Sequence, residues 1–150
     1  MDERRLLAIG NLAVEAANLE VIMFGLTHAA VGGTYKVFQA IAAQQSFEQL
    51  ASLTTRVLIA RGLMTEEIKQ WIVTAKAIMV KRNLYLHGVT DNDTGNVFNR
   101  RSTPALVEVE SEEIDAIANE ANAHLASALP ILVQLRESVG DGGIGAELSE

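Results

Sequence analysis

The sequence contains no cysteine, only two prolines and few aromatic residues. Because cysteine is absent, disulfides, thiolate metal sites and cysteine nucleophiles are excluded. The low proline content, together with abundant alanine and leucine, favours helices. The chain also lacks the H-E-x-x-H, Walker A, G-x-S-x-G and dinucleotide-binding patterns, and its three scattered histidines do not have the spacing of a metal site. We therefore expect no metal and no cofactor.

A long uninterrupted apolar segment is not evident near the N-terminus either. Met1–Arg5 is charged, and the apolar segment that follows is interrupted by Asn11, Glu15, Asn18 and Glu20. We find in this pattern neither a signal-peptide core nor a membrane-length apolar run. The sequence therefore predicts a soluble, cytoplasmic protein that does not contact a membrane.

The net charge of −7 argues against a protein that coats nucleic acid generally. The charge is unevenly distributed, since residues 62–102 carry +2 and the rest of the chain carries −9. The basic residues of this segment are Lys69, Lys76, Lys81, Arg82, Arg100 and Arg101. A patch of this size suits a few phosphates rather than a long duplex.

Apolar periodicity predicts five helices. They cover residues 4–29, 34–44, about 46–61, 65–87 and 111–137. Ser46 and Gln49 have the spacing of a capping box, Thr65 and Ser111 suit N-caps, and Gly62 suits the position after a helix end. Pro130 would kink the last helix or end it early.

Residues 89–109 differ in composition from the helical segments. Turn residues at 91–96 and strand-like residues at 97–98 and 106–109 predict a short β-hairpin, with an irregular segment at 100–104. We therefore expect an all-α, up-and-down bundle of about five helices with a short β-hairpin or irregular excursion before the last helix.

The same pattern predicts one domain over residues 1–137 and a flexible acidic tail over residues 138–150. In the first helix one row is expected in the core, and a second apolar row indicates that the helix is covered on most sides. The first row is Leu12, Ala16, Leu19, Met23 and Leu26, and the second is Val14, Ala17, Val21 and Phe24. In the second helix Val37, Phe38 and Ile41 are expected to face inward.

The fourth helix carries the most unusual feature of the chain. Its apolar stripe comprises Ile68, Trp71, Ile72, Ala75, Ile78 and Met79. The same face continues into Arg82, Asn83, Leu86 and His87, although burying unpaired polar groups costs several kcal/mol, as an order of magnitude. One interpretation is that Arg82 and His87 satisfy the last carbonyls of the helix. The other is a shared functional site, which the surrounding basic residues favour.

Glu20 has two interpretations that the sequence leaves open. A glutamate at the rim of the first helix, reaching solvent, is the one we favour. The alternative is a buried acid paired with an arginine, for which Arg82 is the candidate.

The segment Arg82-Asn83-x-x-x-His87-Gly88, at the end of an amphipathic helix, resembles the signature of the HEPN superfamily. The order of the predicted elements over residues 4–137 is similar as well: a long first helix, a short second one, the helix with the motif, an excursion and a long last helix. The resemblance implies a metal-independent endoribonuclease of the toxin, defence or RNA-processing type, acting as a homodimer with one composite cleft. A cognate antitoxin or another partner protein is also implied.

The resemblance assigns roles to particular residues. His87 would transfer a proton to or from the attacking 2′-hydroxyl or the leaving oxygen, and Arg82 would bind the scissile phosphate. Asn83 would orient the histidine or the phosphate. Lys81, Arg100 and Arg101 would guide the RNA backbone. Members paired with nucleotidyltransferase antitoxins often have a tyrosine two residues after the histidine, where this chain has Val89. Neutralisation through that tyrosine is therefore not expected.

Two other classes of function remain open. The acidic balance and the acidic tail favour a non-catalytic helical interaction module, or a regulatory or antitoxin partner of another protein. A helical bundle that binds a small ligand or nucleotide is a third possibility. The fourth helix is apolar near its C-terminal end. We therefore predict a dimer, as the endoribonuclease hypothesis with its composite cleft requires.

Overall fold

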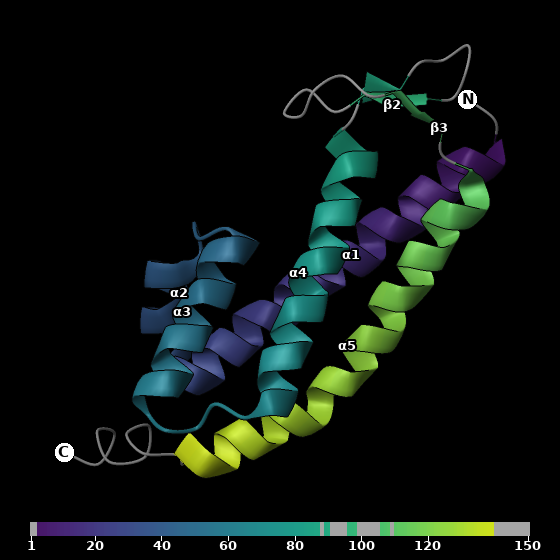
Figure 1. Cartoon of the computed structure of the whole chain (residues 1–150). Helices are drawn as coiled ribbons and strands as arrows, with labels where there is room; N and C mark the ends of the chain where they lie inside the picture. Colours follow the sequence, from purple (N-terminus) through teal and green to yellow (C-terminus); the bar gives the residue numbers. More distant parts are fainter. Residues whose placement is uncertain (1–2, 88, 91–95, 99–105, 109, 140–150) are drawn as a thin grey trace.

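The computed structural model describes residues 3–87, 89–90, 96–98, 106–108 and 110–139, with the backbone alone for residue 87 and the three short strand segments. The predicted all-α fold with five helices is confirmed (Figure 1). The helices are α1 (Glu3–Val31), α2 (Tyr35–Ala42), α3 (Phe47–Ala60), α4 (Glu66–His87) and α5 (Ser111–Val139).

The two long helices α1 and α5 lie side by side and run in the same direction, and α4 crosses in front of α1 in the opposite direction (Figure 1). An ion pair of 2.6 Å between Arg4 Nη2 and Glu112 Oε1 joins the first turn of α1 to the first turn of α5. At the other end, the side chain of Val139 lies close to Gly32, just after α1. Helix α3 packs against α1 and α4, and α2 lies next to α3 (Figure 1).

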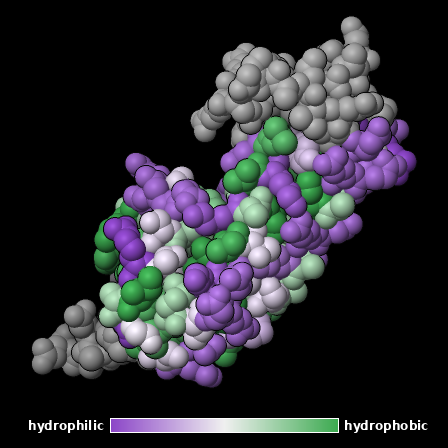
Figure 2. Space-filling model, in the orientation of Figure 1, coloured by the Kyte–Doolittle hydropathy of each residue, from purple (hydrophilic) through white to green (hydrophobic). Residues whose placement is uncertain are grey.

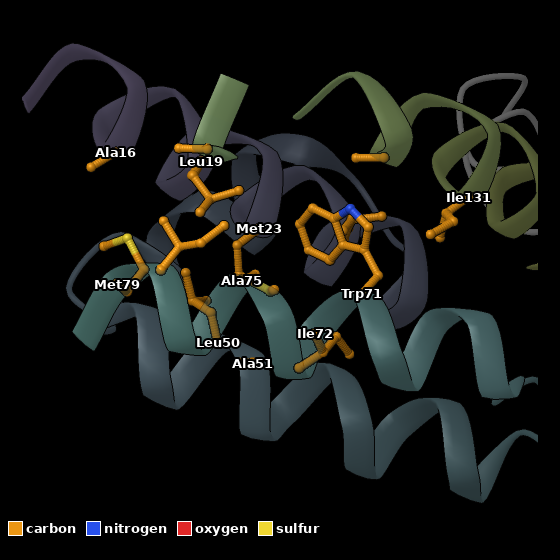
Figure 3. Packing of buried hydrophobic residues seen from close by; sticks show 14 of the residues in the cluster. Ala16, Leu19, Met23, Leu50, Ala51, Trp71, Ile72, Ala75, Met79 and Ile131 are labelled. Carbon is orange, nitrogen blue, oxygen red and sulfur yellow. The ribbon is translucent and has the colours of Figure 1, made fainter. Parts of the chain in front are cut away.

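The core is formed by one side of α1 together with α3, α4 and α5. All five members of the predicted core row of α1 are buried, and so are all six residues of the predicted stripe of α4. Figure 3 shows Leu19 and Met23 of α1 facing Leu50 of α3 and Met79 of α4. The 3.6-residue period therefore located the centre of the fold correctly.

The second apolar row of α1 was predicted wrongly except at Phe24, which is partly buried against the core. Val14 and Val21 are exposed, because α3, α4 and α5 all pack on the opposite side of the helix. The expectation that no membrane-length apolar run exists was also wrong, since α1 is long and apolar enough to cross a membrane by length and composition. The core helix of a soluble protein and a signal sequence meet the same criterion, and 28% of the apolar window of α1 is buried in the described structure.

Two buried threonines connect α1 to α3. Thr27 Oγ1 lies 2.7 Å from the carbonyl of Met23, Thr54 Oγ1 lies 2.8 Å from that of Leu50, and the two hydroxyl oxygens lie 2.8 Å apart. Each hydroxyl has one proton, so these three contacts hold two hydrogen bonds at any moment. The pair fixes the relative position of the two helices without leaving a buried hydroxyl unbonded.

Helix α4 is joined to α5 through Trp71. Its indole N–H donates to the carbonyl of His124 at 3.1 Å and to Ser127 Oγ at 3.2 Å. The imidazole of His124 stacks on the indole with ring centroids 4.6 Å apart, and its Nε2 lies 2.8 Å from the carbonyl of Trp71. The only tryptophan of the chain is thus a polar and aromatic link between two helices.

The predicted signals for helix ends are confirmed for α3 and α4. Ser46 and Gln49 form both bonds of a capping box, and Gly62 has the positive φ of 68° that suits the position after a helix. Thr65 Oγ1 accepts a hydrogen bond of 3.2 Å from the backbone N–H of Ile68. Of the three residues of α2 that were expected to face inward, however, only Phe38 is buried, whereas Val37 and Ile41 are exposed. That part of the prediction was wrong because this short helix packs through a single edge.

The predicted hairpin is confirmed, and a third strand joins it. Strands β1 (Val89–Thr90), β2 (Asn96–Phe98) and β3 (Leu106–Glu108) form a small antiparallel sheet in the order β1-β2-β3. In the hairpin Val97 pairs with Val107.

The expected N-cap of the last helix was wrong, and of the two outcomes predicted for Pro130 the early end of the helix is excluded. Ser111 is not its N-cap, since the carbonyl of Glu110 already accepts bonds from Glu113 N and Ile114 N, one residue earlier. The helix continues through Pro130 to Val139, although it changes direction in its C-terminal half (Figure 1). Residues 138 and 139 are therefore helical rather than part of a tail, and residues 140–150 lie outside the described part of the chain.

Candidate functional site

The motif of the fourth helix occupies the last two turns of α4. The buried stripe runs through Ile78 and Met79 to Tyr85, so it passes beside Asn83 rather than through it. The Arg82 side chain is 20% exposed and lies at the edge of the core, whereas Asn83 is exposed. The interpretation that polar groups replace core residues therefore holds in part for Arg82 and is wrong for Asn83.

Arg82 has three different environments for its nitrogen atoms. Nη1 donates a hydrogen bond of 2.9 Å to Asn83 Oδ1, and Nη2 lies 3.7 Å from Glu20 Oε1. Nε is buried and has no hydrogen-bond partner among the described residues. Glu20 is at the rim, as favoured from the sequence, and Arg82 is its partner, as the alternative interpretation suggested. The long separation leaves the guanidinium only loosely neutralised.

Arg82 and Asn83 line a groove of about 450 Å³ between α1, α4 and the start of α3. Lys76 is the second cation of the groove, and it forms an ion pair of 2.6 Å with Glu48. The groove thus contains two basic and two acidic side chains, counting Glu20 among the latter. An anion that enters it would have to compete with both carboxylates.

Lys76 was not singled out by sequence analysis. Its position seven residues before Asn83 puts the two side chains on the same face of α4, so helical spacing was the available signal. The contribution of Glu48 depends on how α3 packs against α4, which no local pattern reveals.

The other predicted site residues are distributed as follows. Lys81 lies on the side of α4 that faces α5, where its Nζ is 3.3 Å from Glu120 Oε2 in an exposed ion pair. His87 is the last residue of α4, four residues after Asn83, and its side chain lies outside the described part of the structure. Arg100 and Arg101 also lie outside the described residues.

A contact missed by sequence analysis holds the motif end of α4 to the start of α5. The buried Tyr85 donates a hydrogen bond of 2.8 Å from its hydroxyl to Glu113 Oε1. Burial, followed by the hydrogen bond and the charge of Glu113, raises the pKa of Tyr85 to about 12. The phenol therefore stays neutral at physiological pH and anchors the last turns of the helix.

The two described histidine side chains both have structural contacts. His28 Nε2 lies 3.0 Å from the carbonyl of Gly33, and its ring stacks on Phe38 at 4.9 Å. His124 stacks on Trp71. Within the described part of the chain, no group of three or more histidine or acidic side chains is arranged to hold a metal ion.

No protein-family model, curated protein or solved structure matches this chain. Fold and site together define an all-α bundle with a mixed-charge groove beside the C-terminal end of α4. Its function is therefore inferred from the residues and geometry of that groove.

Proposed function

We propose that this protein is a metal-independent endoribonuclease of the HEPN type, which acts as a homodimer through Arg82, Asn83 and His87. The observation that carries the proposal is the pairing of Arg82 with Asn83 at an accessible groove, one helical turn before His87. An arginine held at the edge of the core has lost part of its freedom of movement, so it is suited to binding a phosphate in a fixed orientation.

In the proposed reaction the 2′-hydroxyl of RNA attacks the adjacent phosphorus and the 5′ oxygen leaves. His87 transfers a proton to or from one of these oxygens. Arg82 stabilises the charge that develops on the phosphate, and its loose contact with Glu20 is exchanged for the stronger contact with the anion. Asn83 keeps the guanidinium in place through the bond of 2.9 Å.

The outer face of α4 supports the dimeric form of the proposal. Val73 and Val80 are exposed on this face, Val80 to 69%, and Leu84 and His87 follow at helical spacing. Apolar side chains that recur along the exposed side of a helix favour packing against another helix. A second copy of α4 in this position would bring two motif ends close to a common cleft.

The test is cleavage of a mixed RNA pool by the purified protein in the presence of a chelator. We expect cleavage that is unaffected by chelation and is lost in His87→Ala, with Arg82→Ala at least a hundredfold slower. His28→Ala is the matched control, because it removes a partly exposed histidine that is not part of the groove. Absence of cleavage for every RNA tested, or full activity in His87→Ala, would exclude the proposal.

A second candidate function is a non-catalytic interaction module, which the outward face of α1 favours. Leu7, Val14 and Val21 recur on this face at intervals of seven residues and are all exposed. A surface helix normally presents polar residues outward, so this face suits contact with another protein. If Arg82→Ala and His87→Ala leave the biological effect intact while Val14→Glu abolishes it, the interaction module is the correct assignment.

A further inference from the structure

A second hollow in the molecule has a different chemistry from the groove of the proposed function. It has a volume of about 580 Å³ and lies between α2, α3 and the segment that follows α1. This volume is within the usual range for small-molecule sites and corresponds to about twenty water molecules. The two hollows adjoin each other, because Gln45 and Glu48 line both of them.

One wall of this α2–α3 pocket is apolar. It is formed by Val37 and Ile41 of α2, with Phe38 between them and Val31 at the end of α1. Val37 and Ile41 are more than half exposed although they are large and aliphatic. Hydrophobic residues are visible on the α2–α3 side of the molecule (Figure 2, left).

The opposite wall comes from one face of α3 and from Gln45 just before it, and it is polar except for Leu53. Gln45, Gln49, Ser52 and Arg56 follow one another at intervals of three or four residues and all line the pocket. From Gln49 to Arg56 the helical part of the wall extends about 10 Å along α3. The pocket therefore has one apolar side and one side able to donate hydrogen bonds.

The charge of the pocket comes from Arg56. Its guanidinium makes no hydrogen bond or ion pair with any described residue, whereas Glu48, the acid of the pocket, is already paired with Lys76 at 2.6 Å. An unpaired cation beside an apolar wall is complementary to a molecule with an apolar body and one anionic group. A cation or a neutral polar ligand would not use both features.

We propose that the α2–α3 pocket binds an amphipathic monocarboxylate, with its aliphatic body against Val37 and Ile41 and its carboxylate on Arg56. The volume of the pocket admits a ligand of at most roughly 20 heavy atoms, so a medium-chain acid such as decanoate, with about 12, fits within it. This inference does not depend on the ribonuclease proposal, because no residue of the motif lines the pocket.

The experiment is a titration of the full-length protein with decanoate, followed by calorimetry and by amide chemical shifts. Decyltrimethylammonium, which has the same chain and the opposite charge, is the comparison ligand. We expect saturable binding of decanoate, at least tenfold tighter than that of the cation, with shifts concentrated in α2 and α3. Binding of the two ligands with equal affinity, or no saturation at millimolar concentration, would overturn the proposal.

Two variants and two matched controls assign the contacts. Arg56→Gln should weaken decanoate at least fivefold without affecting the cation, whereas Ile41→Ser should weaken both ligands. Both residues are exposed, so the fold is expected to persist, which circular dichroism checks. Lys69→Gln and Val133→Ser make the same chemical changes outside the pocket and should have no effect. Unchanged decanoate binding in Arg56→Gln would contradict the assignment.

Two other occupants give distinguishable results. If Ile41→Ser converts a dimer into a monomer in light scattering, the pocket is an interface between two copies of the chain, and the ligand proposal is overturned. If Ile144→Ser or Leu148→Ser in the full chain raises decanoate affinity, the C-terminal segment competes with decanoate for the pocket, and the proposal is supported.

Discussion

Glu20 provides a direct test of whether the groove beside Arg82 binds phosphate. Glu20 Oε1 lies 3.7 Å from Arg82 Nη2, so the carboxylate competes with any anion that approaches the guanidinium. Two unit charges about 4 Å apart interact by about 1 kcal/mol in water and by about 4 kcal/mol at an effective dielectric constant of 20. Since Glu20 is 46% exposed, the lower figure applies. Removal of its charge in Glu20→Gln should therefore tighten RNA binding about fivefold.

Fluorescence anisotropy with a labelled 2′-O-methyl RNA measures this change without cleavage, because the attacking hydroxyl is blocked. We expect the fivefold difference at 50 mM salt. It should vanish at 1 M salt, where the screening length falls to about 3 Å. Glu66→Gln is the matched control, since Glu66 is an exposed acid at the start of α4 that does not line the groove. Its effect on RNA binding should be much smaller.

The reasoning is refuted if Glu20→Gln binds RNA as wild type does, or more weakly. Unchanged binding would mean that phosphate does not reach Arg82. Weaker binding would mean that Glu20 is needed to hold Arg82 in position, so that the contact is structural rather than competitive. In the first case the groove is not the phosphate site that the proposed function requires, and in the second the competition between Glu20 and phosphate is disproved.

Three further predictions concern stability and can be measured by urea denaturation followed by circular dichroism. Tyr85→Phe should remove a pH dependence: the neutral phenol stabilises the wild type fully below pH 10, and about 2–3 kcal/mol is lost as the pH rises through about 12, whereas the variant should lack this loss. Equal alkaline profiles for the two proteins would contradict the burial of Tyr85. Thr27→Val and Thr54→Val should each cost about 1 kcal/mol, and the double variant clearly less than the sum, because a single replacement leaves one hydroxyl against a methyl group. Strict additivity would show that the two hydroxyls are independent. Trp71→Phe should cost about 1–3 kcal/mol through loss of its bonds to α5, and a neutral result would mean that water replaces them.

The sequence predicted those features of the fold that depend on neighbouring residues. The capping box of Ser46 and Gln49, the cap at Thr65 and the glycine at 62 require only local hydrogen bonds and backbone angles, and all are present. The predictions failed where burial depends on which helices meet. Val21 is as apolar as Leu19, yet only Leu19 is buried, because all the other helices pack on one side of α1.

In the candidate site, too, contacts within one helix were predictable and most contacts between helices were not. The adjacency of Arg82 and Asn83 follows from their position on one helix, and the contact with Glu20 was one of two interpretations that apolar spacing allowed. The contacts of Glu48 and of Glu113, the partner of Tyr85, were not predictable. Each residue comes from another helix, and no local pattern determines how that helix is rotated about its axis or shifted along it. The α2–α3 pocket was missed for the same reason.

The pairing of the first long helix with the last has a consequence for biosynthesis. Helix α1 is complete early in translation, but α5, its most extensive neighbour, follows only after Ser111. At about 5–20 residues per second the ribosome needs roughly 5–20 s to synthesise the intervening chain. During that interval the part of α1 that α5 covers in the folded protein stays exposed. We expect nascent chains to be engaged by chaperones over this window.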